Sequence, residues 1–440
     1  MKKMIFVPII IVLSCLLLAA CEPVGDSSPF DLTAGVSEEI KHERNNDNLI
    51  IWSDIEFGDE HIQEFEKANP GVQVEVVEKS VGTQLQDYMQ AMADDEPVDI
   101  FVMDSSFLGK FSTLQGFEDL SAEPYNADRF KEGVSETVWN NHLSINEDKL
   151  FALPVALSPV VLYYRADLMD KYGFPSNSEA LSLYLRSEKN LFALAEKMKA
   201  KGHSIFLWDT IAIDLYIAKF GFLNANYENN IPEEEFLKSI QLTETIIRNR
   251  YPANKDIWLQ EGQQAIRNEE VIMLTLGSWG EKYLPEFAPD QSGKWRAAKP
   301  PLSLSGWSSS TALAIPSHSE KKQLAWKFIE FTMEKGMDFE EWPLVPAYEP
   351  TRMEKWRRDQ VNPYFGNQKT YALYDELLAK SDVNKVTPFD DELYLTLYNV
   401  ILPGIDREKE PEEIYKDYIK TLNEKYGEQM EVLRGIDLTK

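Results

Sequence analysis

Residues 49–76 read LIIWSDIEFGDEHIQEFEKANPGVQVEV, and this stretch decides the fold class. The apolar run at 49–52 predicts a buried strand. Residues 57–68 carry apolar side chains at helical spacing, and the Asn-Pro-Gly that follows stops the helix. Residues 72–76 alternate between apolar and polar, which predicts a second strand. A strand, a helix and a strand in this order are typical of a parallel sheet covered by helices.

The same alternation continues toward the C-terminus. Residues 83–93 again show helical spacing, and 98–103 form another apolar run. We therefore predict an α/β fold on an open parallel sheet, in which ligands bind beyond the carboxyl ends of the strands. Two polar groups follow these strands: Ser53-Asp54 and Asp104-Ser105-Ser106. These side chains either bind a ligand or cap the helices that follow, and their residue types suit both roles.

The chain begins with two lysines, an apolar run and small residues ahead of Cys21. This order predicts a secretory signal peptide over residues 1–20, and the run from Met4 to Leu18 is too short to span a bilayer comfortably. Leu18-Ala-Ala-Cys21 resembles the lipobox of bacterial lipoproteins, whose cysteine is diacylated and becomes the new N-terminus. The resemblance implies a lipid anchor, for instance palmitate, at Cys21 on the extracytoplasmic face of the cell membrane. The alternative is an ordinary cleaved signal with a chance cysteine.

Composition limits the possible partners. Residues 21–47 are polar and lack apolar periodicity, which predicts a flexible tether. Cys15 leaves with the signal peptide and Cys21 carries lipid, so we expect no disulfide in the mature domain. The 440 residues suggest two domains, and 73 acidic against 45 basic residues disfavour nucleic acid and anionic lipid as partners. The acidic excess also serves solubility on its own.

A long apolar, proline-marked run at 150–165 predicts a strand that leaves the first lobe. It completes a series of motifs in chain order: Ile50-Ile-Trp52, Ala68-Asn-Pro-Gly71, Pro97–Asp104, Phe151-Ala-Leu-Pro154, Leu162-Tyr-Tyr164 and Asp167-Leu168. In this order the motifs resemble the extracellular solute-binding proteins of family 1, the sugar-binding subunits of ABC importers.

Later segments extend the resemblance over roughly residues 48–430. They are a helix at 191–201, a strand at 204–207 with the loop Trp208-Asp209, a helix at 236–250, a helix, strand and Gly-Ser-Trp turn at 263–279, a return strand at 306–316, a helix at 324–331 and a late turn at 344–348. The resemblance implies a two-lobed, type II periplasmic-binding-protein-like α/β fold with a ligand cleft and a hinge. Lobe one would comprise 48–156 plus 297–350, and lobe two 157–296 plus 351–440. The closed form would engage the permease subunits of the transporter, and we expect a monomer.

Neutral sugars offer hydroxyls and flat apolar ring faces, which carboxylates, amides and aromatic rings recognise. Carried over by motif position, the predicted ligand-binding residues are Asp54, Glu56, Asp104, Ser105, Ser158, Trp208, Asp209, Trp279, Trp307 and Tyr348. Trp279, Trp208 and Trp307 would be stacking platforms, although tryptophan is often simply core. Two positions depart from the family pattern: Ser158 replaces a carboxylate found in some members, and Gly306-Trp-Ser replaces paired glycines.

Other function classes have weaker support in the sequence. A glycosidase would use two carboxylates, but among 73 acids such pairs are unavoidable. The sequence contains no Gly-x-Ser-x-Gly, and its five histidines have no metal-ligand spacing, so we predict no catalysis, metal or cofactor. A tethered sensor or adhesion lipoprotein, or a binding protein for a cation such as a polyamine, remains open. Which sugar binds, and at what chain length, does not follow from the sequence.

Overall fold

The structure is a computed structural model, and it describes residues 48–336, 344–381 and 384–435. The predicted signal peptide, the tether, the lipid attachment at Cys21 and Trp342 lie outside these residues. One sheet of eight strands has the order β2-β1-β3-β7-β4-β5, and β6 and β8 also pair with β4. The strands are β1 (Asn48–Ser53), β2 (Gln73–Glu78), β3 (Ile100–Asp104), β4 (Leu153–Arg165), β5 (Met273–Gly277), β6 (Trp295–Ala298), β7 (Trp307–Ala314) and β8 (Val345–Pro346).

Helices cover both faces of the sheet. They are α1 (Asp59–Ala68), α2 (Gln84–Ala93), α3 (Ser105–Phe111), α4 (Glu136–Asn140), α5 (Ala166–Lys171), α6 (Ser178–Tyr184), α7 (Glu188–Lys199), α8 (Ile211–Phe220), α9 (Glu233–Arg248), α10 (Gln260–Arg267), α11 (Gly280–Phe287), α12 (Lys322–Lys335), α13 (Glu349–Arg352), α14 (Lys355–Asp359), α15 (Thr370–Leu378), α16 (Asp390–Asp406) and α17 (Pro411–Arg434). The α/β class predicted from the alternating pattern is confirmed.

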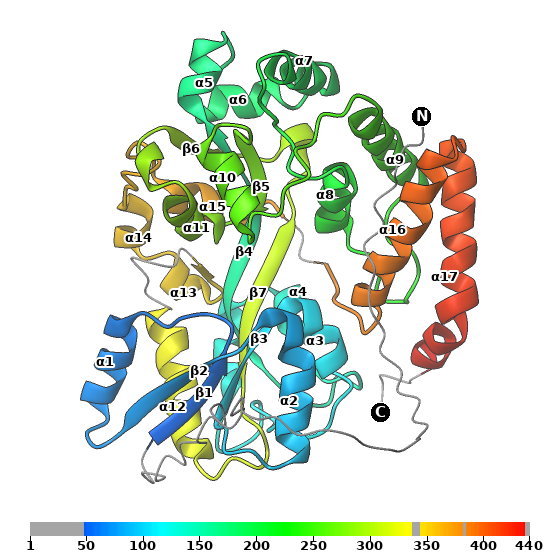
Figure 1. Cartoon of the computed structure of the whole chain (residues 1–440). Helices are drawn as coiled ribbons and strands as arrows, with labels where there is room; N and C mark the ends of the chain where they lie inside the picture. The colour runs from blue at the N-terminus through cyan, green and yellow to red at the C-terminus, as the bar shows by residue number, and fades with distance from the viewer. Residues whose placement is uncertain (1–47, 337–343, 382–383, 436–440) are drawn as a thin grey trace, which may run out of the picture. The chain divides into compact units, whose positions relative to one another are not determined.

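The first strands pair as the sequence predicts. β1 is parallel to both β2 and β3, whereas β3 is antiparallel to β7. Side chains alternate across β3: Ile100 and Val102 pack with α1 and α12, while Phe101 and Met103 pack with α2 and α3. Figure 1 shows these helix pairs on opposite sides of β1 and β3. The parallel part of the sheet is therefore buried on both faces, as parallel strands require.

β4 joins two groups of strands. All thirteen of its residues are buried, so it reads as a continuous apolar run rather than an alternating one. Its first half pairs with β7 and β8, and its second half pairs with β5 and β6. The register shifts beside Pro154 and Pro159, which lack the N–H that a regular ladder needs. In Figure 1, β4 and β7 run side by side between the two strand groups, which are the centres of the two lobes.

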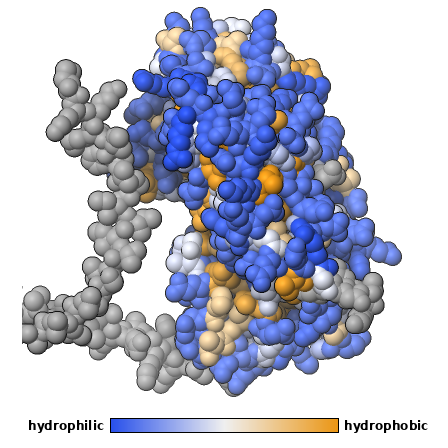
Figure 2. Space-filling model, turned by 90° about the vertical axis from the view of Figure 1, so that its right-hand side faces the viewer, coloured by the Kyte–Doolittle hydropathy of each residue, from blue (hydrophilic) through white to orange (hydrophobic). Residues whose placement is uncertain are grey.

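The C-terminal helices form a separate layer. α16 and α17 pack on each other and on α8 and α9 through an apolar cluster that includes Ile213, Phe236, Ile240, Leu397 and Tyr418. These four helices lie together on the right of Figure 1. The same side of the molecule, turned to the viewer in Figure 2, is mainly hydrophilic, with apolar side chains gathered in a few patches. The C-terminal pair of helices therefore forms an apolar core with α8 and α9.

One predicted strand is wrong. Residues 204–207 make only two isolated bridges, from Ser204 to Val271 and from Phe206 to Pro252. The hydroxyl of Ser204 donates to the carbonyls of Phe206 and Tyr251 and accepts from the Phe206 N–H. This side-chain hydrogen bonding takes up backbone groups that a ladder would have used.

Candidate ligand-binding site

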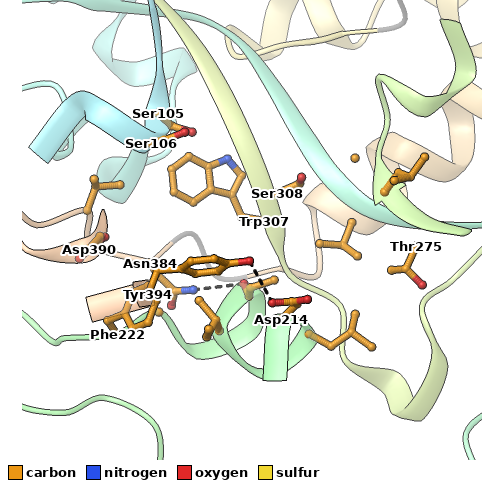
Figure 3. Close-up of a pocket in the computed structure, with 18 of the residues that line it drawn as sticks. Ser105, Ser106, Asp214, Phe222, Thr275, Trp307, Ser308, Asn384, Asp390 and Tyr394 are labelled. Carbon is orange, nitrogen blue, oxygen red and sulfur yellow. Dashed lines mark hydrogen bonds between the residues drawn. The ribbon is translucent and has the colours of Figure 1, made fainter. Parts of the chain in front are cut away.

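The main pocket has a volume of about 500 Å³ and lies where several element ends meet (Figure 3). It is lined by the start of α3, the end of β5 and the residues after it, the start of β7, α8, segment 384–386 and the start of α16. β7 begins very close to α8, because a Cβ on Gly306 would lie 2.4 Å from the carbonyl of Ala218. Only glycine fits at this position. This accounts for Gly306 in the Gly306-Trp-Ser motif, which differs from the paired glycines of the family pattern. Segment 384–386 is held by Asn141, which donates to the Asn384 carbonyl and accepts from the Val386 N–H.

Aromatic rings form much of the wall of the main pocket. Trp279, Trp307, Phe222 and Tyr394 line it. Figure 3 shows Trp307 projecting into the space between the serines of α3 and Tyr394. The indole Nε1 of Trp307 is buried and makes no hydrogen bond to any residue that the structure describes. The pocket therefore offers flat apolar faces and, at Trp307, a buried donor without a partner among the described residues.

Carboxyl groups form the polar part of the main pocket. Asp214 accepts hydrogen bonds from Thr210 at 3.0 Å, from Tyr394 at 3.3 Å and from Tyr398. Burial raises the pKa of Asp214 to about 6. Burial also raises the pKa of Asp390 to about 7, although Thr387 donates a hydrogen bond to it. Neither carboxyl makes an ion pair with a lysine or arginine of the described chain.

Two other charged groups of the pocket already have partners. Asp391 pairs with Lys110 at 3.0 Å, and Lys385 pairs with Glu147 at 3.5 Å. The lining thus carries three carboxyls and one lysine, and that lysine is engaged with a residue outside the lining. An occupant of the main pocket meets hydrogen-bond acceptors and a negative potential.

A second pocket of about 640 Å³, which we call the acidic groove, follows the carboxyl end of β1. Its charged lining consists of Asp54, Glu56, Asp59, Glu78, Lys282 and Glu286. Burial and the neighbouring charge of Asp104 raise the pKa of Asp54 to about 6. Gln84 bridges the two strand ends, donating to Asp54 at 3.0 Å and accepting from the Asp104 N–H at 2.9 Å. Glu56 and Lys282 form an ion pair of 2.9 Å that links the loop after β1 to α11.

The predicted site residues divide between these pockets and the surrounding structure. Ser105, Trp279 and Trp307 line the main pocket, and Asp54 and Glu56 line the acidic groove. The roles of these five residues in binding remain predictions.

Five other predicted residues line neither pocket. Asp104 caps α3 by accepting from the Ser106 N–H at 2.8 Å, so the capping alternative is confirmed there, and burial raises its pKa. Ser158 is buried and hydrogen-bonds Ser278, which supports the turn that carries Trp279. The remaining three are Trp208, Asp209 and Tyr348.

Those three residues serve local packing in this structure. Trp208 packs beside Ile257 in an apolar cluster, and Tyr348 meets Phe130 edge-on at 5.3 Å. Burial raises the pKa of Asp209, whose neighbours include the carboxyl of Asp406. The roles of these three residues in ligand binding stay predictions.

Sequence reasoning missed the contribution of α8, segment 384–386 and α16. Asp214, Phe222, Asn384, Asp390 and Tyr394 line the main pocket and were not predicted. One signal was available for Asp214. It is the only acid in the mainly apolar helix IAIDLYIAKF, where an unpaired charge is costly.

Comparison with known proteins agrees with this geometry. The family described as bacterial extracellular solute-binding protein matches residues 55–336. The chain belongs to this family. Its members are binding proteins, and the predicted two-lobed fold of such proteins is confirmed.

Solved structures of the family superpose over most of the chain. The sugar-binding protein MalE from Xanthomonas citri is 16% identical, covers 88% of this chain and 99% of its own, and gives a TM-score of 0.68. The ABC-transporter-associated binding protein from B. animalis subsp. lactis Bl-04, in complex with β-1,6-galactobiose, is 17% identical, covers 87% and 98%, and gives 0.68. A binding protein of Brucella abortus (strain 2308) is 23% identical over 375 residues, which are 80% of this chain and 85% of that protein. At these identities the structural likeness concerns the fold.

Within 48–336, 344–381 and 384–435, no cluster of three or more His, Cys, Asp or Glu side chains has the arrangement of a metal site. Over the same ranges, every helix is too short or too polar to cross a lipid bilayer.

Proposed function

We propose that this protein captures a carbohydrate, an oligosaccharide, outside the cytoplasmic membrane and delivers it to the permease of an ABC transporter. The observation that carries the proposal is the lining of the main pocket. Trp279 and Trp307 stand there together with Ser105, Asp214 and Tyr394. Flat apolar faces beside carboxyl and hydroxyl groups are the combination that a sugar ring requires.

The polar groups are well prepared for hydroxyl recognition. Asp214 is oriented by three hydroxyl donors, so it loses little freedom when a ligand arrives. Its carboxylate oxygens accept hydrogen bonds from sugar hydroxyls, and the free Nε1 of Trp307 donates one to a sugar oxygen. A buried donor without a partner costs free energy, and a ligand oxygen would remove that cost.

The relatives support the substrate class. The X. citri protein is named for sugar binding, and the B. animalis protein was solved with a galactobiose and is associated with an ABC transporter. We extend these properties to the present chain because it shares the fold of these proteins, and because its main pocket combines aromatic faces with carboxyl and hydroxyl groups. We propose no catalytic activity for it.

The experiment that tests the proposal is isothermal titration of the purified protein with neutral mono- and oligosaccharides, uronides and polyamines. Binding of one saccharide series supports carbohydrate capture. A matched thermal-shift series checks it, since a ligand at about 100 times its dissociation constant adds roughly 2.7 kcal/mol to stability. Silence with every saccharide in both measurements contradicts the proposal.

One observation favours a second candidate, a cationic ligand such as a polyamine. The main pocket has three carboxyls, Asp214, Asp390 and Asp391, and only Lys385 in opposition. An ammonium group would pair with Asp214 or Asp390 and lower the pKa of either carboxyl. Binding of polyamines without binding of saccharides would select this candidate.

We also propose that Cys21 is diacylated and anchors a monomeric protein on the extracytoplasmic face of the membrane. The lipobox-like residues 18–21 support this proposal. Labelled palmitate should be incorporated by the wild type and by Cys15→Ser but not by Cys21→Ser. Equal labelling of all three would contradict the anchor.

A further inference from the structure

Trp258 is an exposed tryptophan with an aromatic setting. It lies in the turn before α10, and 54% of its surface is exposed, as is 56% of the neighbouring Leu259. Its ring centroid lies 5.7 Å from that of Trp279, 4.8 Å from Tyr283 and 6.0 Å from Phe287. The last two rings meet it edge-on, at 88° and 84°. Three neighbours therefore fix the plane of an indole that still faces solvent.

The neighbours of Trp258 belong to both pockets. Trp279 lines the main pocket and Tyr283 lines the acidic groove. The centroids of these two rings are 6.1 Å apart. Trp258 lines neither pocket itself, but its ring packs against both of these pocket residues, so it lies beside the junction of the two pockets.

The backbone that carries Trp258 is also firmly held. Asp256 accepts a hydrogen bond from the Trp258 N–H at 2.9 Å, and its carbonyl accepts one from Leu259 at 3.1 Å. A Cβ on Gly262 would lie 2.0 Å from that same carbonyl, so α10 packs against the turn at a distance only glycine allows. A platform with a fixed backbone and a fixed ring plane loses little entropy when a ligand covers it.

We infer that Trp258 forms an outer sugar-binding subsite at the junction of the main pocket and the acidic groove. It stacks on units of an oligosaccharide that extend beyond the main pocket, and it makes the protein selective for longer chains. The carboxyls of the acidic groove, Glu56 and Glu286 among them, accept hydroxyl hydrogen bonds from those outer units. The inference rests on the proposed function and names the part of the ligand that this surface recognises.

A second exposed tryptophan provides the matched control. Trp356 is 50% exposed, but its Nε1 donates to Glu354 at 2.9 Å and the Arg357 guanidinium covers its ring at 4.4 Å. It lines neither pocket. Its substitution removes a similar exposed indole without touching the junction.

The test is a titration of the purified full chain with a saccharide series of increasing length, chosen from those that the wild type binds. Trp258→Ala should weaken binding of the longest members by about tenfold and leave the shortest within about twofold. Trp258→Phe should recover part of the loss, and Trp356→Ala should change nothing. Thermal melting of the unliganded variants shows whether Trp258→Ala still folds, and Trp258→Phe keeps the test valid if it does not.

Four results would overturn the inference. An equal loss at all lengths would mean that Trp258 only supports Trp279, and unchanged affinity at all lengths would mean that it does not touch the ligand. Unchanged affinity with reduced uptake in cells would place Trp258 against the permease. If the wild type binds no saccharide of any length, the proposed function fails and this inference fails with it. In the other three outcomes the wild type still binds saccharides, so the proposed function stands while the inference fails.

Discussion

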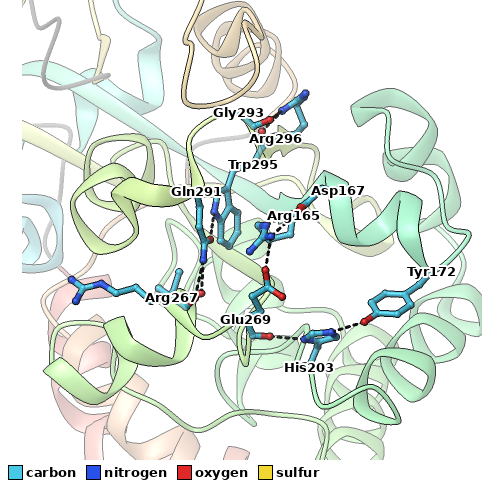
Figure 4. Close-up of polar contacts among 11 residues, drawn as sticks. Arg165, Asp167, Tyr172, His203, Arg267, Glu269, Gln291, Gly293, Trp295 and Arg296 are labelled. Atoms are coloured by element: carbon cyan, nitrogen blue, oxygen red, sulfur yellow. Dashed lines mark hydrogen bonds and ion pairs between the residues drawn. The ribbon is translucent and has the colours of Figure 1, made fainter.

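Two polar clusters contain buried ionisable groups: Arg165 at the far end of β4, and Asp214 and Asp390 in the main pocket. In the first, Arg165 is fully buried and donates to Asp167 at 2.8 and 2.7 Å and to Glu269 at 2.8 Å (Figure 4). The carbonyl of Glu269 contacts His203 at 2.6 Å, and Tyr172 contacts the other ring nitrogen. Although burial alone would raise it, the hydrogen bonds and charge of Arg165 hold the pKa of Asp167 below its usual range.

The carboxyls Asp214 and Asp390 of the main pocket have no such cationic partner. Asp214 is held by neutral hydroxyl groups and Asp390 by Thr387, so burial raises the pKa of both carboxyls. A buried arginine paired with carboxylates is typical of structural support, whereas carboxyls without a cationic partner that face a cavity are typical of a binding site. The difference separates a residue that supports the lobe from residues that we propose bind a ligand.

The largest effect is expected from a substitution that breaks the ion pairs of Arg165. Arg165→Ala leaves a cavity where the buried guanidinium lay, whereas the side chains of Asp167 and Glu269 are 41% and 38% exposed and stay solvated. We therefore expect a loss on the order of 3 kcal/mol in the free energy of unfolding, mainly from the cavity. Urea denaturation measures this loss. Exposed Arg186→Ala is the control and should change stability by less than about 0.5 kcal/mol. Equal effects of the two variants would mean that the cluster is not structural.

The next effect concerns ligand affinity. Trp279→Ala removes the stacking face of the main pocket and should weaken saccharide binding by roughly 2 kcal/mol, or about thirtyfold. Titration measures the change, and Arg165→Ala at a temperature where it is folded should bind as the wild type does. Loss of affinity in Arg165→Ala alone would reverse the roles assigned to the two clusters.

A smaller effect appears in the pH dependence of stability. Asp214 titrates near pH 6 when folded and near its ordinary value when unfolded, so the folded state binds the proton more tightly. Its contribution is fully present below the unfolded pKa and is lost as pH rises through about 6.

Asp214→Asn should therefore be more stable than the wild type above pH 7, by on the order of 1 kcal/mol, and this advantage should fade toward pH 4. Urea denaturation across this range gives the comparison. Asp391→Asn serves as the control in the same pocket, because Lys110 pairs with it. A stability difference that does not vary with pH would contradict the raised pKa of Asp214.

The smallest effect concerns the ion pair of the acidic groove. The side chain of Glu56 is 78% exposed and that of its partner Lys282 is 13% exposed, so screening by water limits their attraction. Glu56→Gln should cost less than about 1 kcal/mol, and less again at high salt. Chemical denaturation at two salt concentrations measures it. A larger loss in the free energy of unfolding, unaffected by salt, would show that this contact resembles the ion pairs of Arg165 more than an exposed surface pair.

The fold was more predictable than the site, for a physical reason. β1, α1, β2, α2 and β3 follow from apolar spacing within short windows, and β4 follows from an unbroken apolar run. Trp279 followed from its turn after a strand. By contrast, part of the main pocket is formed by the first residues of α16. These residues line the pocket together with residues of α8 and β7, from which they are distant in the sequence. The packing of the C-terminal helices places them there, and local spacing does not predict that packing.

The predicted residues outside the pockets show the same limit. Trp208 and Tyr348 occupy motif positions near the predicted cleft, but both are half-buried and pack against apolar clusters outside the two pockets. Trp258, which is exposed beside Trp279, belongs to no motif and was not predicted. Local patterns predict elements, whereas the direction of each side chain depends on contacts between distant elements.

The most direct test of carbohydrate capture is a crystal structure of the complex with the saccharide that binds most tightly. We predict sugar rings against Trp279 and Trp307, with hydroxyls hydrogen-bonded to Asp214 or Tyr394 in the main pocket. A saccharide bound at another surface, with the main pocket free of sugar, would contradict the account.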